Sequence, residues 1–259
     1  MLLSAFVDQG PILPPRRPAH LRRFPTPARV TRFLRRWMRG TAEVTLRYPV
    51  DAVLPTNRHQ YPGPVSPTPD LLRPHPGDAT TIQRPSAGVG PLFHRVYWID
   101  IADAEMSPEA LVDLLLADVN LAAPDALGRF EDVDGTGSKN LEVGDEVVVR
   151  LPGPWDAPVR VVDRTPTSFR LVTLRGHIEA GEIAFRARRT DAGHLRFEVE
   201  SWARSSSHLL HVLYDVLNLA REMQLLMWAR MCRAVVDLTG GTAVEDVQVV
   251  TERGEWPPA

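Results

Sequence analysis

The chain of 259 residues is 44% hydrophobic and 24% charged, which is an ordinary globular composition and predicts a buried core. A formal net charge of -2 argues against a dedicated nucleic-acid binder, and the apolar runs are too short for a transmembrane helix. The single cysteine, Cys232, excludes an internal disulfide and a multi-thiolate zinc site, and we expect it to be a core thiol.

The N-terminal part of the chain is rich in proline and arginine. Residues 1–91 hold 16 of the 24 prolines, a density that helices and central strands do not tolerate. We therefore expect an N-terminal arm (1–91) whose later half, 55–91, is an extended strap over the domain. Its apolar anchors would be Leu54, Tyr61, Leu71, Leu72 and Ile82. The first residues lack the basic and apolar regions of a secretory signal, so we expect a cytoplasmic protein without stable membrane insertion.

Within this arm, one short helix is predicted between the N-cap Thr26 and the stop at Gly40, with Pro27 at its first position. Its apolar residues fall on one face and five arginines occupy the rest. The basic face could be attracted to an anionic membrane or an acidic partner, and the apolar face could equally dock on the chain's own domain. Both interpretations remain open.

From Phe93 the pattern changes to strands and helices. Residues 95–101 read as a strand, Ser107 and Pro108 begin a helix, and a short second helix is predicted over Pro124 to Phe130. Five strand-like runs follow, at 145–151, 158–164, 168–174, 182–188 and 194–202, separated by turn residues. Consecutive hairpins of this kind predict an antiparallel meander.

A long amphipathic stretch follows the strands and ends near Leu238, and as a helix it would be roughly 45 Å long. We predict an α+β helix-grip domain over 92–240, in which a curved antiparallel sheet wraps around this C-terminal helix. Residues 241–259 are expected to be a C-terminal tail. Three methionines of the helix, Met223, Met227 and Met231, would face the sheet and give any cavity there an adaptable wall.

The last hairpin can be predicted in more detail from the alternation of side chains. Leu195, Phe197 and Val199 must share one face with Ile183 and Phe185 across the hairpin. That register opposes Arg186 to Glu198 and Glu182 to Trp202 on the face away from the long helix. It leaves Asp191 to Gly193 as the loop, with Gly193 in the left-handed conformation.

Motifs for metals and cofactors fail when their spacing is checked. A calcium-like loop from Asp132 has Val143 where a bidentate glutamate is needed. His208, His211 and Asp215 share one helical face and could hold a metal, although capping or surface hydrogen bonds are their usual fate. We therefore expect no metal and no cofactor.

One segment, Arg164 to Arg204, resembles the family catalogued as a domain of unknown function (DUF1990). The resemblance is carried by a Leu-x-Gly-His-x-x-x-Gly-Glu string, which consists here of Leu174, Gly176, His177, Gly181 and Glu182. That family is grouped with START-like (SRPBCC) helix-grip domains. The resemblance implies a lipid-sized or aromatic ligand in a cavity, and it implies no established reaction.

The preferred function is therefore the binding of a hydrophobic small molecule or acyl chain between sheet and helix. The expected ligand-binding residues are Met223, Met227, Met231, Tyr214, Phe185, Phe197 and His177, with His177 either touching the ligand or only shaping its turn. A cyclase- or hydratase-type enzyme would use polar residues of the helix: Tyr214, Asp215, Asn218, Arg221 and Glu222. An interaction protein would use the basic N-terminal helix. The catalytic residues and the oligomeric state stay open.

Overall fold

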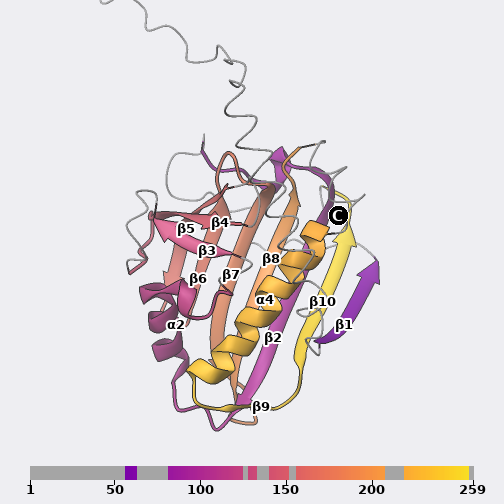
Figure 1. Ribbon diagram of the computed structural model, residues 1–259. Coiled ribbons are helices and arrows are strands. Elements are labelled where there is room, and N and C mark those ends of the chain that lie inside the picture. Colours follow the sequence, from indigo (N-terminus) through magenta and orange to yellow (C-terminus); the bar gives the residue numbers. More distant parts are fainter. Residues whose placement is uncertain are drawn as a thin grey trace, which may run out of the picture.

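The computed structural model describes residues 56–62, 81–124, 128–132, 140–151, 156–207 and 219–256. These residues form an α+β fold in which helices cover one face of a large mixed sheet (Figure 1). The strands are β1 (Thr56–Pro62), β2 (Val89–Ala102), β3 (Arg129–Asp132), β4 (Glu146–Arg150), β5 (Asp156–Thr165), β6 (Ser168–Thr173), β7 (Glu179–Arg189), β8 (Leu195–Ser205), β9 (Thr242–Ala243) and β10 (Val247–Gly254).

The strand order across the sheet is β1-β10-β2-β8-β7-β6-β5-β4-β3, and β9 pairs with β2. Strands β3 to β8 follow one another as antiparallel hairpins, which confirms the meander predicted for β4 to β8 and adds β3 to it. Strand β2 joins the far side of β8, and β10 joins β2, both antiparallel. Strands β1 and β10 are parallel, which makes the sheet mixed.

In the described ranges, two α-helices lie on the same side of the sheet. Helix α2 (Pro108–Ala117) begins as predicted, because the Ser107 hydroxyl accepts a hydrogen bond from the Ala110 amide at 3.2 Å. The described part of the long helix is α4 (Leu219–Leu238), which runs along β2 and β8 (Figure 1). Short 3-10 turns occupy Pro85–Ala87 and Val119–Leu121. No helix in the described ranges is long and apolar enough to cross a membrane.

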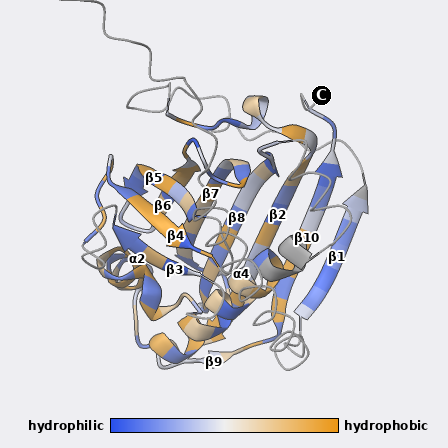
Figure 2. Cartoon of the chain, turned by 45° about the horizontal axis from the view of Figure 1, so that its top comes forward, coloured by the Kyte–Doolittle hydropathy of each residue, from blue (hydrophilic) through white to orange (hydrophobic). Residues whose placement is uncertain are grey.

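The sheet has two faces of different character, as the alternating colours of its strands indicate (Figure 2). The inner face, which carries α2 and α4, is the main core: Ile99, Phe197 and Val235 are at most 1% exposed there. The outer face carries two smaller apolar clusters, one around Leu92 and Trp202 and one of four residues, Ile82, Val162, Val172 and Leu174. Alternation along each strand therefore places most apolar side chains against the helices.

The β7/β8 hairpin has the predicted register. Glu182 is opposite Trp202 and Arg186 is opposite Glu198, and Gly193 has a φ of 80° in the connecting loop. At Gly181 the two strands come unusually close, since an added Cβ would lie 1.9 Å from the Trp202 carbonyl oxygen. The second glycine of the Leu-x-Gly-His-x-x-x-Gly-Glu string is thus required by backbone packing.

Two predicted elements differ from the structure. The helix expected over Pro124 to Phe130 does not include Phe130, which belongs to β3. The Asn120 side chain accepts a hydrogen bond from the Phe130 amide at 2.8 Å and donates one to the Phe130 carbonyl oxygen at 2.9 Å. Residues 241–259, expected as a tail, contain β9 and β10. Strand β10 buries Val247 and Val249 against the inner core, so this segment completes the sheet.

The described part of the arm lies on the sheet rather than away from it. Ile82 bridges to Leu174 and is buried in the outer cluster. Tyr61 is 56% exposed on β1, so it is not the anchor that was expected. Strand β2 begins at Val89, slightly inside the expected arm. Leu54, Leu71, Leu72 and the basic helix after Thr26 lie outside the described residues.

Candidate functional site

The layer between α4 and the inner face brings four of the predicted ligand-binding residues into one apolar cluster. Met227 and Met231 come from α4, and Phe185 and Phe197 come from β7 and β8. Trp228 meets the Phe185 ring edge-on, with ring centroids 5.6 Å apart. The side chains of Met223 and Tyr214, with the other polar helix residues proposed for an enzyme, lie outside the described part of the chain.

A group of polar side chains interrupts this apolar layer; we call Arg95, Tyr97, Glu179 and Gln224 the interlayer polar cluster. Arg95, from β2, is 5% exposed and donates a hydrogen bond to the Gln224 side-chain oxygen on α4. The Gln224 amide donates in turn to the Glu179 carboxylate on β7 at 2.8 Å. Helix and sheet are thereby joined through partly buried polar contacts.

Tyr97 belongs to this cluster by position and by electrostatics. It lies two residues after Arg95 on β2, hence on the same face, and is fully buried. Burial raises the pKa of its phenol to about 12, an effect that the charge of Arg95 opposes and that of Glu179 strengthens. Arg95 also opposes this rise as a hydrogen-bond donor, and the hydroxyl finds no acceptor for its own proton among the described residues. Tyr97 is thus a protonated hydroxyl in an apolar layer.

His177 lies in the turn before β7 and contacts Glu179 of the polar cluster. Its Nδ1 accepts a hydrogen bond from the Glu179 amide at 2.9 Å, and burial lowers the pKa of the imidazole to about 4. Gln83 of the strap donates to the carbonyl oxygens of His177 and Glu179, at 2.9 and 2.7 Å. His177 therefore holds the backbone of Glu179, and a direct ligand contact stays a prediction.

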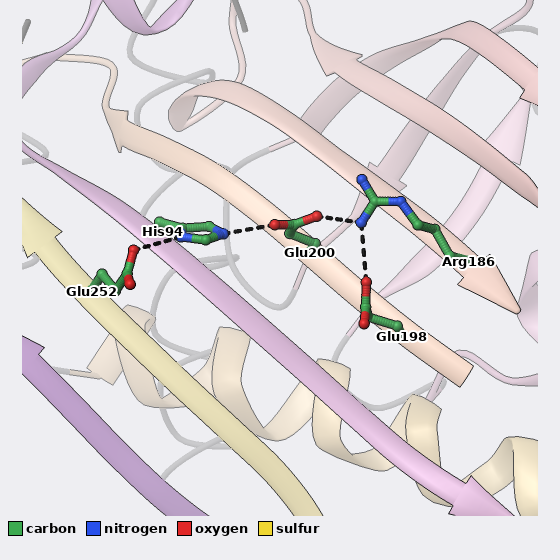
Figure 3. Close-up of polar contacts among 5 residues, drawn as sticks. All are labelled: His94, Arg186, Glu198, Glu200 and Glu252. Atoms are coloured by element: carbon green, nitrogen blue, oxygen red, sulfur yellow. Dashed lines mark hydrogen bonds and ion pairs between the residues drawn. The ribbon is translucent and has the colours of Figure 1, made fainter. Parts of the chain in front are cut away.

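The outer face carries a second polar group, the outer-face network of His94, Arg186, Glu198, Glu200 and Glu252 (Figure 3). The two ring nitrogens of His94 lie 2.8 Å from carboxylate oxygens of Glu200 and Glu252. Burial alone would lower the pKa of His94, but the two carboxylates outweigh it and raise that pKa. His94 also stacks on Trp202 at 4.8 Å. This network links β10, β2, β8 and β7 on the side away from α4.

Sequence reasoning missed the interlayer polar cluster, although one signal was available. Arg95 occupies an inward position in the alternating strand that also holds Tyr97 and Ile99, where an apolar residue is expected. Glu179 and Gln224 gave no such signal, because only the tertiary fold brings the start of β7 and α4 to Arg95.

No group of three or more metal-binding side chains occurs in the described ranges. His208, His211 and Asp215 are outside those ranges, so the expected lack of a metal stays a prediction. Cys232 is fully buried on α4, as expected for a core thiol, and burial raises its pKa. The thiol is accordingly neutral and inert.

Residues 129–234 match the model of a family described as a domain of unknown function (DUF1990). The resemblance predicted from residues 164–204 is thereby confirmed for this part of the chain. The match runs from β3 into α4 and leaves out β1, β2, β9 and β10. No curated protein matches the sequence.

Several solved structures are similar to the chain. Protein Ms6760 from Mycobacterium smegmatis is 14% identical, with 56% of this chain and 89% of that chain covered at a TM-score of 0.38. A point mutant of norcoclaurine synthase from Thalictrum, solved with a transition state analogue, is 10% identical, with 58% and 98% covered at 0.40. Ara h 8.0201 is 12% identical, with 54% and 98% covered at 0.34.

Proposed function

We propose that the chain is a helix-grip domain that binds a hydrophobic small molecule or acyl chain between α4 and the inner face of the sheet. The interlayer polar cluster carries this proposal. A buried arginine and an unpartnered phenol are costly in a layer that serves only as core. They are useful where a bound molecule with a polar end completes their hydrogen bonds.

The side chains around the cluster suit an occupant of variable shape. Met227 and Met231 are unbranched and polarizable, so they can rearrange around a ligand at low cost. Phe185 and Phe197 offer flat apolar surfaces on the opposite side of the layer. The arrangement resembles many small-molecule sites, which are mostly apolar with a few placed polar groups.

Native mass spectrometry of the freshly purified full chain is the first test. We expect a mass excess that disappears after organic extraction. The extracted protein should then take up the neutral probe N-phenyl-1-naphthylamine with increased fluorescence. Met231→Trp, which fills the layer, should reduce that uptake several-fold, whereas Leu121→Trp at a 47% exposed position should not. A wild-type protein that takes up no probe would disprove the proposal.

The interlayer polar cluster also supports a second candidate, an enzyme of the cyclase or hydratase type. The buried Tyr97 phenol is protonated at neutral pH and can donate to a carbonyl oxygen, and the Glu179 carboxylate can accept a proton. In this case Tyr97→Phe would abolish turnover of a bound polyketide-like or enone substrate while leaving uptake of the neutral probe intact. Equal turnover by Tyr97→Phe and wild type would exclude this role for Tyr97.

The third interpretation, an interaction protein with a basic N-terminal helix, depends on residues outside the described ranges. Its test is sedimentation of the full chain with anionic liposomes at low and high salt. We expect little sedimentation, because the proposal above gives the helix no membrane role.

A further inference from the structure

The hydrogen-bonding groups of the interlayer polar cluster are unbalanced. A guanidinium has five N–H donors, and the acceptor that Arg95 contacts at hydrogen-bond distance within the described ranges is the Gln224 side-chain oxygen, with the Tyr97 hydroxyl oxygen close by. The guanidinium also lies 5.1 Å from the centroid of the Phe93 ring, which offers no acceptor oxygen. Arg95 is 5% exposed, so water has little access to the remaining donors.

Two more donors in the same layer have no acceptor in the described structure. One is the Tyr97 hydroxyl, which is protonated at neutral pH as phenols are, and whose pKa burial raises further to about 12. The other is the Trp228 indole nitrogen on α4, one helical turn after Gln224, and an indole can only donate. Tyr97 of β2 and Phe185 of β7 both lie opposite Val199 of β8, and the Phe185 ring contacts Trp228.

Two acceptors of the cluster already have donors. The Gln224 oxygen accepts from Arg95, and a Glu179 oxygen accepts from the Gln224 amide. Gln224 therefore stands between the arginine and the carboxylate and presents each with its complementary end. A layer with surplus donors and engaged acceptors is complementary to a group that has acceptors only.

We infer that the interlayer polar cluster binds the carboxylate of an apolar carboxylic acid, with Arg95 as its charged partner and the Tyr97 hydroxyl as a second donor. This inference rests on the proposed function and names the ligand class. A carboxylate fits better than a neutral carbonyl, because hydrogen bonds between a guanidinium and a carboxylate are charge-assisted and frequently bidentate. The hydrocarbon part of the acid then lies along Phe185, Phe197 and Met231.

Matched acids and esters test the inference directly. Displacement of N-phenyl-1-naphthylamine at pH 7.5 is measured with dodecanoic acid, methyl dodecanoate, 2-naphthoic acid and methyl 2-naphthoate. These two pairs distinguish an acyl chain from an aromatic body. In the preferred pair, we expect the wild-type protein to bind the acid about 10- to 100-fold more tightly than its ester, as charge-assisted hydrogen bonds predict.

Three variants assign this preference to residues. Arg95→Met should reduce the acid-to-ester ratio to within about 3-fold, and Tyr97→Phe should weaken acid binding about 5-fold. Arg196→Met is the matched control, because Arg196 pairs with Asp100 on the outer face and should keep the wild-type ratio. If Arg95→Met does not fold, the acid-to-ester ratio of the wild-type protein and the acid affinity of Tyr97→Phe test the inference.

The outcomes separate the inference from the proposed function. Equal affinity for acid and ester in the wild-type protein would overturn the inference while ligand binding stands. The inference would also fail if Arg95→Met kept the full preference for the acid. Failure of the wild-type protein to take up the probe or any of the four compounds would overturn both.

Discussion

His94 shows how single residues on the outer face contribute to stability. With both ring nitrogens directed at carboxylates, the imidazole makes its best contacts when it is protonated. Its pKa is raised above 6.5 in the folded chain, so this contribution is complete below pH 6.5 and is lost as pH rises through the folded pKa. Glu200 has the opposite sign: its lowered pKa gives a contribution that is lost as pH falls below 4.5.

The wild-type protein should therefore lose stability as pH rises through the pKa of His94, and His94→Gln should not. We expect the wild-type protein to lose about 0.5 to 1 kcal/mol as pH rises above 6.5, a typical value for a partly exposed ion pair. The variant should lack that slope. Urea unfolding at several pH values between 5 and 9 measures it, with the exposed His59→Gln as control. A slope that persists in His94→Gln would assign it to another group.

His177 should act in the acid range with the opposite sign. Its pKa is lowered from 6.5 to about 4 in the folded chain, so the unfolded chain binds more protons between these values. Folding stability should then fall as pH decreases from 6.5 to 4. His177→Asn keeps an acceptor near the Glu179 amide but does not titrate, and it should flatten this part of the curve. An unchanged acid slope in urea unfolding would contradict the assignment.

At the scale of elements, local patterns predicted the hairpins of β4 to β8 and helix α2, but they wrongly placed Phe130 in a helix. The alternation of Phe185 and Phe197 with charged neighbours fixed the β7/β8 register, and Ser107 with Pro108 fixed the start of α2. Strands β1 and β10 have no hairpin partner next to them in the sequence, so no local signal paired them. The interlayer polar cluster was missed for the same reason, since β2, β7 and α4 meet only in the tertiary fold.

Among the described glycines, Gly181 leaves the least room for a side chain. The Cβ of Gly181→Ala would overlap the Trp202 carbonyl oxygen, so β7 and β8 would have to separate. We expect a loss of about 2 to 3 kcal/mol or more in the free energy of unfolding. Gly193→Ala has open space around it and strains only a φ of 80°, so it should lose about 1 kcal/mol. Chemical denaturation that ranked the two variants in reverse would contradict the close approach.

At the scale of the whole molecule, the two ends of the described chain should contribute unequally. Truncation after Ala243 removes β10, which separates β1 from β2 and buries Val247 and Val249. We expect this variant to aggregate, because the long β2 edge is then exposed and β1 loses its partner. Deletion of residues 1–80 removes only β1 from the described sheet and should lower the melting temperature by several degrees. Thermal melts and gel filtration of both variants test this ranking.

The parallel pairing of β1 with β10 has a consequence for the order of events during synthesis. Residues 56–62 emerge from the ribosome early, but their partner, residues 247–254, is made about 185 residues later. At 5 to 20 residues per second this delay is roughly 10 to 40 s. In that interval the meander of β3 to β8 can pair locally while β1 has no template. Strand β1, the first described strand to be synthesised, is therefore the last to join the sheet.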